Sequence, residues 1–582
     1  MCGIYGVVGP DVHTGRMGAL LAHRGPDGEN ETAVSGATLG HRLLSIRDTP
    51  QVSGQPVTRA GSPWMLSFNG QLYNTATLAL HESIPYADLD TTMLFELIIR
   101  RGWEFVSHIE GMFAIALYNT ESHELRLYRD ASGQKPLYYM RVDGTVRFAS
   151  EIKALIDASD KRVDTLGLAV AETIGFIPGG RTLISGIMKV PPGACVHITQ
   201  NEMHTESFAA GETEYEGEPR EVMRTCIREH LLGREQVVIN LSGGMDSSLL
   251  AYEMKELGFK VITYTTRFDI DSPRFNDDAD LAQKLARDLG TDHREILITK
   301  REYMNRLECS LAAVEEPNYN VSIPTYLALA EREGANGDGW RVVLSGDGGD
   351  EIFGGYDQYK SHQRHAEKAQ RFGFLYNAAL ALRSGRYTDF SDPAARWLYH
   401  KRFRGTPPDT RVLPYLRAER ERWAAKNASP RTDAVYQGMV SDRALWLAGE
   451  NFIRSDKIFM TQSVELRSPL AYPPLRRYFD ARLSATDYFK GSFNKVALRA
   501  LYRGALPSYI TDREAKTGWR SPVSLWYDAS MKRTFLDILS DAPNILDWNN
   551  VRSVVEKTDR WPSKEIHVYL SLAALAKKFS LT

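Results

Sequence analysis

The chain has 582 residues, of which 43% are hydrophobic and 25% are charged. This composition excludes collagen-like, low-complexity and wholly disordered chains, and the length predicts more than one domain. With 71 Lys and Arg against 73 Asp and Glu, the formal net charge is −2. Such a balance gives no electrostatic footprint for nucleic acid or anionic lipid, so we expect no nucleic acid and no membrane as partners, and small-molecule substrates instead.

The cysteines and the apolar stretches indicate the compartment. The four cysteines are scattered without paired spacing: Cys2, Cys195, Cys226 and Cys309. They suggest neither a disulfide framework nor a zinc site. The first residues lack the pattern of a secretory signal, and the longest apolar stretches are shorter than the ~18 residues of a membrane span. We therefore expect a cytoplasmic protein.

The N-terminal part of the chain is rich in predicted strands. Residues 65–68 form an apolar run before Asn69-Gly70, a dipeptide that is typical of a turn. Residues 91–101 place apolar side chains at helical spacing, and Asp90 stands where it would cap that helix. Strands interrupted by such a helix predict an α+β sandwich.

The pattern changes after a polar stretch, and we place a domain boundary there that divides the chain into residues 1–210 and 211–582. Beyond it, apolar strands at residues 237–241, 261–266 and 342–344 alternate with glycine-bearing turns and helices. Repeated βαβ units predict an α/β domain with a parallel, doubly wound sheet, whose ligands bind at the carboxyl ends of the strands. The remainder of the chain is predicted to be a helical elaboration of this domain.

Cys2 is the first candidate catalytic residue. Removal of Met1 would leave a thiol and a free α-amine on Cys2. An α-amine that titrates near pH ~8 can act as general base for the thiol of its own residue. A Met-Cys start alone is usually without catalytic meaning, so the interpretation depends on the residues that follow.

Five segments in order resemble the class II glutamine amidotransferases: residues 1–9, 23–28, 40–41, 69–74 and 129–139. The resemblance implies an Ntn-type β-sandwich glutaminase domain in which Cys2 attacks the side-chain amide of glutamine. It also implies that Asn69 and Gly70 contact glutamine and form the oxyanion hole, and that Asp90 binds the α-ammonium of glutamine.

The sequence Ser-Gly-Gly-Met-Asp-Ser at residues 242–247 follows an apolar strand and resembles a PP-loop. Glycines at this point let backbone N–H groups converge on an anion at a helix N-terminus, which suits the pyrophosphate of ATP. The resemblance implies an ATP site at three strand ends, formed by Leu241, Ser242, Gly243, Gly244, Asp246, Ser247, Thr266, Ser345 and Gly346. Asp246 is also expected to bind Mg²⁺, because hard cations on carboxylate oxygens offset the charge of ATP.

Four segments closely resemble the asparagine synthetase signatures: residues 316–317, 322–325, 344–356 and 464–469. The match implies that Asp350 is the second Mg²⁺ ligand and that Asp347 lies near the reacting amine and the intermediate. Residues 513–519 resemble the family's R-x-K-x-G-F segment with one extra residue before the lysine. Lys516 is thus the candidate that stabilises charge on the phosphate and on the tetrahedral intermediate.

The resemblance to glutamine-hydrolysing asparagine synthetases spans nearly the whole chain. It implies an ATP-dependent carbon–nitrogen ligase in which Cys2 releases ammonia from glutamine, and the ammonia travels through an internal tunnel. ATP adenylates a carboxylate, by default that of L-aspartate, and ammonia then displaces AMP. Adenylation is needed because a carboxylate at neutral pH is a poor electrophile. The resemblance leaves a homodimer open.

Two alternatives stay open. β-Lactam and amide synthetases share the scaffold and couple an adenylated carboxylate to an amine, but they often lose the N-terminal cysteine and tend to carry Tyr at the position of Asp347. Cys2 and Asp347 therefore favour the amidotransferase. A non-catalytic homologue is the other alternative, and Asp246, Asp350 and Lys516 argue against it.

Two residues depart from the family's glutamine pocket. The family motif Gly-His-x-Arg-Leu-Ser-Ile provides an Arg for the α-carboxylate of glutamine where this chain has Leu43, and Asn-Gly-Glu is replaced by Asn-Gly-Gln at Gln71. We expect glutamine hydrolysis to be weak or the pocket to use another arrangement. Arg47 is a candidate substitute for the missing Arg, whereas Arg42 neighbours Leu43 on a strand and so points to the opposite face.

His362 and His365 have helical spacing but no third ligand in view. We interpret them as part of a solvated helix face rather than as a metal site.

Overall fold

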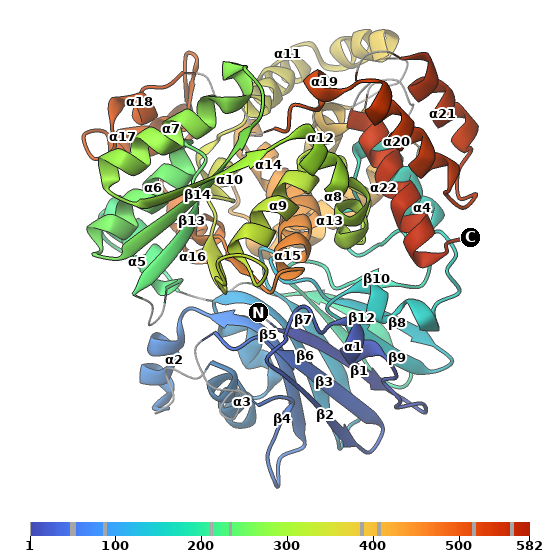
Figure 1. Ribbon diagram of the computed structural model, residues 1–582. Helices are drawn as coiled ribbons and strands as arrows, with labels where there is room; N and C mark the ends of the chain where they lie inside the picture. The colour runs from blue at the N-terminus through green and yellow to red at the C-terminus, as the bar shows by residue number, and fades with distance from the viewer. Residues whose placement is uncertain are drawn as a thin grey trace.

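The computed structural model describes residues 2–46, 54–84, 90–209, 211, 213–231, 235–384, 389–403, 409–514, 520–558, 561 and 564–582. Figure 1 shows the strands of the N-terminal half in the lower part of the molecule and the C-terminal half above them, with the N-terminus at the boundary between the two. The described chain therefore begins next to the C-terminal half.

Two six-stranded antiparallel sheets build the N-terminal half. The first sheet has the order β10 (Met188–Lys189), β8 (Tyr138–Val142), β9 (Thr145–Ala149), β1 (Gly3–Val8), β3 (Ala37–Leu43), β2 (Gly28–Val34). The second has the order β12 (Met203–Ser207), β11 (Ala194–Ile198), β7 (Leu125–Arg129), β6 (Gly111–Asn119), β5 (Trp64–Leu72), β4 (Val57–Thr58). Buried side chains of both sheets, such as Ile4 and Leu127, share one core, so the sheets form the predicted sandwich.

Short helices accompany these sheets: α1 (Met17–Leu20), α2 (Thr75–Glu82), α3 (Asp90–Arg101) and α4 (Thr165–Ile174). The predicted helix at residues 91–101 is α3, whose apolar face packs on the outer side of the second sheet. The strand predicted at residues 65–68 does not end before Asn69-Gly70, because both residues continue strand β5, where Gly70 pairs with Phe113. Asn-Gly favours a turn only when no neighbouring strand fixes an extended backbone.

A five-stranded parallel sheet is the centre of the C-terminal half, as predicted. Its order is β15 (Asp292–Ile298), β14 (Lys260–Phe268), β13 (Gln236–Asn240), β16 (Val342–Leu344), β17 (Glu465–Arg467). Helices α6 (Met245–Glu256), α7 (Pro273–Leu289), α8 (Lys300–Val314) and α9 (Ile323–Glu333) connect or follow these strands. Two of the five strands were not predicted: β15, a largely polar strand at the sheet edge, and β17, which has three residues and enters the sheet from far along the chain.

Helices make up most of the remaining C-terminal half, as predicted. They are α5 (Pro219–Glu229), α10 (Gly349–Phe353), α11 (Gln358–Ser384), α12 (Pro393–Lys401), α13 (Val412–Asn427), α14 (Ala434–Ser441), the π-helical η4 (Asp442–Asn451), α15 (Phe452–Met460), α16 (Pro473–Asp480), α17 (Val496–Tyr502), α18 (Ser508–Thr511), α19 (Val523–Trp526), α20 (Ala529–Ser540), α21 (Trp548–Lys557) and α22 (Lys564–Phe579), with a hairpin of β18 (Phe489–Lys490) and β19 (Phe493–Asn494). Short 3-10 turns complete the chain: η1 (Trp103–His108), η2 (Ile152–Ala154), η3 (Ile156–Ala158), η5 (Pro469–Ala471) and η6 (Ala485–Asp487). None of the helices within the described ranges has the length and apolar character needed to span a membrane.

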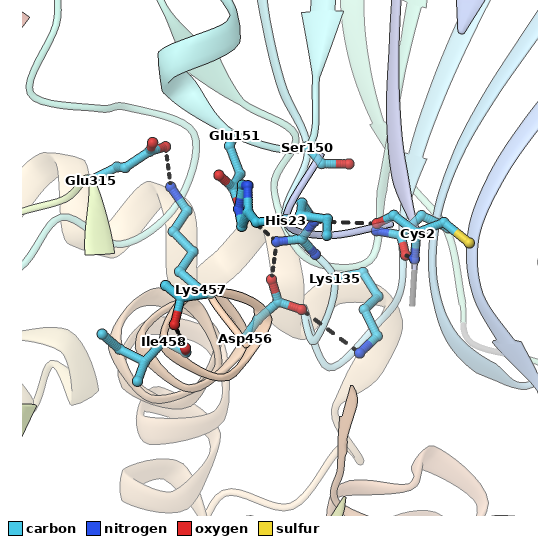
Figure 2. A network of polar contacts seen from close by, with 12 residues as sticks. Cys2, His23, Lys135, Ser150, Glu151, Glu315, Asp456, Lys457 and Ile458 are labelled. Atoms are coloured by element: carbon cyan, nitrogen blue, oxygen red, sulfur yellow. Dashed lines mark hydrogen bonds and ion pairs between the residues drawn. The ribbon is translucent and has the colours of Figure 1, made fainter. Parts of the chain in front are cut away.

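Buried charges join the two halves. The Arg24 guanidinium, with no solvent exposure, donates at 2.8 Å both to Glu151 of its own half and to Asp456 on α15. Lys135 lies 3.8 Å from the other oxygen of Asp456. Figure 2 shows Asp456 and Lys457 next to each other on one helix, with Asp456 directed toward Lys135 and Lys457 toward Glu315.

A second contact repeats this arrangement. Glu315, after α8, accepts a hydrogen bond from the Ile152 backbone N–H at 2.8 Å and pairs with Lys457 at 3.1 Å. Burial raises the pKa of Glu315, but Lys457, Lys578 and Lys153 outweigh it and hold that pKa at about 2. The halves therefore meet through ionised groups that are removed from water. Burying such a charge destabilises the fold unless an opposite charge lies beside it. The domain division at residue 210 stays a prediction.

We predict that Asp456→Asn destabilises the protein by about 3 kcal/mol, because Arg24 and Lys135 would lose a buried countercharge. Chemical denaturation followed by circular dichroism measures the change. The matched control is Asp409→Asn, which removes the partner of Arg411 at the surface and should leave the free energy of unfolding nearly unchanged. Equal effects in the two variants would contradict a structural role for the buried contact.

Candidate functional site

Cys2 immediately precedes β1 and is held by residues of the N-terminal half. Its backbone N–H donates to Asn69 Oδ1 at 2.9 Å, and Arg24 Nε donates to its carbonyl at 3.2 Å. The thiol is buried, and this burial raises its pKa, whereas the backbone N–H of Leu44 acts in the opposite direction. Figure 2 shows the sulfur pointing away from the Asp456–Lys135 contact. The backbone of Cys2 is thus held at two points while its thiol stays separate from the ion network.

Asn69 and Gly70 adjoin this cysteine on β5. Asn69 is fully buried, and its Oδ1 accepts from Cys2, but its Nδ2 makes no hydrogen bond to any residue that the structure describes. A buried amide donor without a partner is costly and is a candidate for binding a ligand oxygen. Gly70 has no room for a side chain, because a Cβ there would lie 2.1 Å from the Met112 carbonyl oxygen.

Gln71 connects Asp90 to the other half of the molecule. Its Nε2 donates to Asp90 Oδ2 at 2.6 Å, and its Oε1 accepts from Arg467 on β17 at 3.2 Å. Asp90 also accepts from the backbone N–H of Leu72 at 3.3 Å. Sequence reasoning missed Arg467, although it lies in the segment 464–469 that carried the resemblance, because nothing local indicates that β17 reaches the glutamine pocket.

The departures at the glutamine pocket are visible in the structure. Leu43 is buried at the end of β3 and contributes no charge. Arg42 donates to the Gly18 carbonyl at 2.8 Å and pairs with Glu29 at 2.8 Å, so it does not replace the missing Arg, as predicted. Arg47, the other candidate, lies outside the described residues.

The predicted phosphate loop joins β13 to α6. Hydroxyls of Ser242 and Ser247 lie 3.0 Å apart, and Ser247 Oγ accepts from the Ser242 backbone N–H at 3.1 Å. Gly243 has a φ of +66°, and a Cβ there would lie 2.7 Å from the Asp278 carbonyl, so the turn requires glycine. Backbone and hydroxyl donors therefore surround the N-terminus of α6, as a phosphate site requires.

Other predicted nucleotide residues lie at the neighbouring strand ends. The loop after β16 packs on the start of α6, because a Cβ at Gly346 would lie 3.0 Å from the Ser247 nitrogen. Ser345 Oγ donates to Asp347 at 2.7 Å and lies 3.2 Å from Ser468 Oγ. Leu241 donates from its backbone to Tyr264 on β14, the strand that also carries Thr266. The structure therefore brings the predicted residues to one edge of the sheet.

Asp246 and Asp350 converge on one cation, the ammonium of Lys495. Lys495 Nζ lies 2.6 Å from Asp246 Oδ1 and 2.5 Å from Asp350 Oδ1, and its side chain is buried. Glycines make room for the carboxylates, because a Cβ at Gly349 or Gly355 would overlap Asp246 or Asp350. Two carboxylates that can share one cation fit the donor set that Mg²⁺ prefers. Sequence reasoning missed Lys495, and its local sequence carried no signal for this contact.

Two remaining predictions have different outcomes. Lys516 lies outside the described residues, so its role stays a prediction. The interpretation of His362 as part of a solvated face is wrong, because the ring is fully buried and lies 4.7 Å from that of His400. Helix α11 is covered on that side by α12 and α14, a contact that spacing along one helix cannot predict.

A buried cysteine beside an unpartnered amide donor in one half, and a glycine-bearing turn near paired carboxylates in the other, fit one class of protein: a glutamine amidotransferase joined to a nucleotide-dependent synthetase. The family model "Asparagine synthase" matches residues 218–577, and the model "Glutamine amidotransferase domain" matches residues 1–209. The chain therefore belongs to the asparagine synthase family. The predicted fold class and the predicted enzyme class, an ATP-dependent ligase with glutamine as amide donor, are confirmed.

Curated relatives cover most of the chain. Asparagine synthetase [glutamine-hydrolyzing] 1 of Bacillus subtilis is 27% identical over 93% of this chain and 90% of the relative. Asparagine synthetase B [glutamine-hydrolyzing] of Escherichia coli is 29% identical over 61% of this chain and 65% of the relative. Amidase chyE of Penicillium rubens is 25% identical over 92% of this chain and 89% of the relative.

We predict that Lys495→Met destabilises the protein by about 3 kcal/mol in metal-free buffer, because Asp246 and Asp350 would lose the buried ammonium that they share. The matched control is Lys490→Met, an exposed lysine on the neighbouring hairpin, with an expected change below about 0.5 kcal/mol. Denaturant midpoints measure both variants. An unchanged midpoint in Lys495→Met would show that this ammonium does not hold the carboxylates together.

Proposed function

We propose that the chain is a glutamine-dependent asparagine synthetase that converts L-aspartate to asparagine with ATP and Mg²⁺. The observation that carries the proposal is the position of β17 between the two sites. Arg467 on this strand donates to Gln71 in the glutamine pocket, and Ser468, the next residue, lies 3.2 Å from Ser345 in the nucleotide site. Strand β17 and the residue after it thus contact both proposed sites. This contact links the places where the two half-reactions would occur.

The first half-reaction uses the residues around Cys2. With Met1 removed, the α-amine that Asn69 Oδ1 holds accepts the thiol proton, and the thiolate attacks the side-chain carbonyl of glutamine. Asn69 Nδ2 and the Gly70 N–H bind the resulting oxyanion. The intermediate expels ammonia, which takes up the proton, and leaves a thioester on Cys2. Water then hydrolyses the thioester to glutamate and regenerates the thiol.

Asp90 is the carboxylate proposed to bind the α-ammonium of glutamine. Gln71 and Leu43 change the pocket in compensating ways, because one removes an acidic group and the other a basic group relative to the family pattern. The net charge of the pocket is therefore unchanged, whereas the bidentate partner for the α-carboxylate is lost. We expect a higher KM for glutamine than a pocket with the Arg would have.

The second half-reaction takes place at the carboxyl edge of the parallel sheet. Asp246 and Asp350 would hold Mg²⁺, which offsets phosphate charge, and Lys495 would then be available to neutralise phosphate oxygens. The carboxylate of aspartate attacks the α-phosphorus of ATP, forming the acyl-AMP and releasing pyrophosphate at the Ser242–Gly244 loop. Ammonia attacks the activated carbonyl beside Asp347, and AMP leaves as asparagine forms.

A second candidate is an amide synthetase of the type that couples an adenylated carboxylate to an amine. Leu43 favours it, because a weak glutamine pocket suits an enzyme that takes its nitrogen from elsewhere. Pyrophosphate release screened across aspartate, other amino acids and sugar acids distinguishes the two candidates. A cytoplasmic location and a homodimer stay predictions.

We predict that Cys2→Ala lowers glutamine-supported asparagine formation by on the order of 10³-fold or more, while ammonium salts still support it. The variant removes the nucleophile and leaves the nucleotide site intact. Product analysis with each nitrogen source measures the effect, and Cys309→Ala, which removes an exposed cysteine, is the matched control. Glutamine-supported synthesis at the wild-type rate in Cys2→Ala would exclude the two-site mechanism.

We predict that Asp246→Asn lowers aspartate-dependent pyrophosphate release by about a hundredfold or more, because it removes a carboxylate that is proposed to hold the metal ion. Glutamate formation from glutamine should continue, since Cys2 and Asn69 are untouched. Asp541→Asn, a change at an exposed surface aspartate, is the control. Unimpaired pyrophosphate release in Asp246→Asn would contradict the proposed metal site, whereas loss of both activities would indicate misfolding.

A further inference from the structure

The edge of the second N-terminal sheet carries two histidines and a glutamate with no role in the proposed reaction. In the antiparallel pair β11–β12, His197 lies directly opposite His204. Glu206 follows His204 by two positions, and since side chains alternate along a strand, both lie on the same face. The pairing of β11 with β12 therefore places three potential metal ligands on one face of the sheet edge.

The side chains of these residues meet at one point. One ring nitrogen of each histidine and one carboxylate oxygen of Glu206 all lie within 4.8 Å of one another. His204 Nε2 is 2.6 Å from Glu206 Oε1, and the two imidazole rings have their centroids 5.0 Å apart. An ion with bonds of about 2 Å needs ligand atoms roughly 3 to 3.5 Å apart. The half-exposed His204 and Glu206 can reach this spacing by side-chain rotation alone.

His197 is suited to bind a cation through a free lone pair. Its Nε2 is buried and makes no hydrogen bond to any part of the chain that the structure describes, although Glu124 Oε2 lies 3.4 Å away. Beyond this 3.4 Å contact with Glu124, no described residue occupies the nitrogen, so its lone pair is available to an ion.

The charges around the cluster favour a divalent ion. Glu206 and Glu124 bring two carboxylates. Arg126 is the neighbouring cation: it lies opposite His197 on β7, 3.6 Å from Glu124 and 3.6 Å from the centroid of the Trp103 ring. The two carboxylates together exceed this single positive charge.

We propose that His197, His204 and Glu206 form a binding site for a first-row transition-metal ion, with Zn²⁺ as the best match. Two imidazoles and a carboxylate select such an ion over Mg²⁺, which prefers oxygen ligands alone. Glu124 or water completes the coordination. Because Ser207 beside the site donates to the Arg422 carbonyl on α13 at 3.1 Å, the ion would fasten the edge strand next to its contact with the C-terminal half.

Titration of the untagged full-length protein with ZnCl₂ in a calorimeter tests this site, independently of the proposed function. We expect one site whose affinity falls at least tenfold in His204→Ala and in Glu206→Gln. Control variants His81→Ala and Glu121→Gln change an exposed histidine and an exposed glutamate elsewhere and should bind like wild type. Co²⁺ provides a second readout, because its visible absorption in the bound state should be lost in the same two variants.

Retained synthetase activity of His204→Ala shows that the variant is folded, since His204 has no part in the catalytic machinery. Zinc binding of equal stoichiometry and affinity in wild type and His204→Ala would overturn the proposal. Absence of zinc binding by the wild-type protein at micromolar concentrations would overturn it as well.

Discussion

The buried guanidinium of Arg24 is the constraint on which the rest of the structure depends. It donates to the Cys2 carbonyl, to Glu151 and to Asp456 on α15, so one side chain holds the backbone of Cys2, the proposed nucleophile, and joins the two halves. A fully desolvated charge is stable only when its partners are in place. The position of Cys2 is therefore tied to correct packing of the C-terminal half, and the glutaminase site cannot form its full set of contacts alone.

Strand β17 links the proposed glutamine pocket to the proposed nucleotide site. Arg467 enters the glutamine pocket through Gln71, and its backbone carbonyl accepts from Ser345, whose hydroxyl reaches Asp347. A short chain of hydrogen bonds thus runs from Asp90 to the nucleotide edge of the sheet. Because β17 is hydrogen-bonded to residues of both sites, a displacement of one site would also move residues of the other.

Much of this arrangement could be predicted from sequence, because its signals are local. The βαβ repeats, the glycine turn before α6 and the segment around Asn69 are each contained within a few dozen residues. Lys495 and Arg467 could not be predicted, because they meet Asp246 and Gln71 across 249 and 396 residues of chain. The buried His362 was missed for the same reason, since its cover comes from other helices. Long-range packing decided each of these positions, and helical or strand periodicity says nothing about it.

We propose that the two halves act as one enzyme, with ammonia passing between sites that the desolvated contact around Arg24 holds together. The most direct test supplies glutamine with a heavy-nitrogen label on its side-chain amide, together with a large excess of unlabelled ammonium, and measures the label in the asparagine formed. We expect the product to keep most of the label, because ammonia released at Cys2 would reach the second site without mixing with the solvent. Label diluted to the isotopic composition of the bulk ammonium would contradict it.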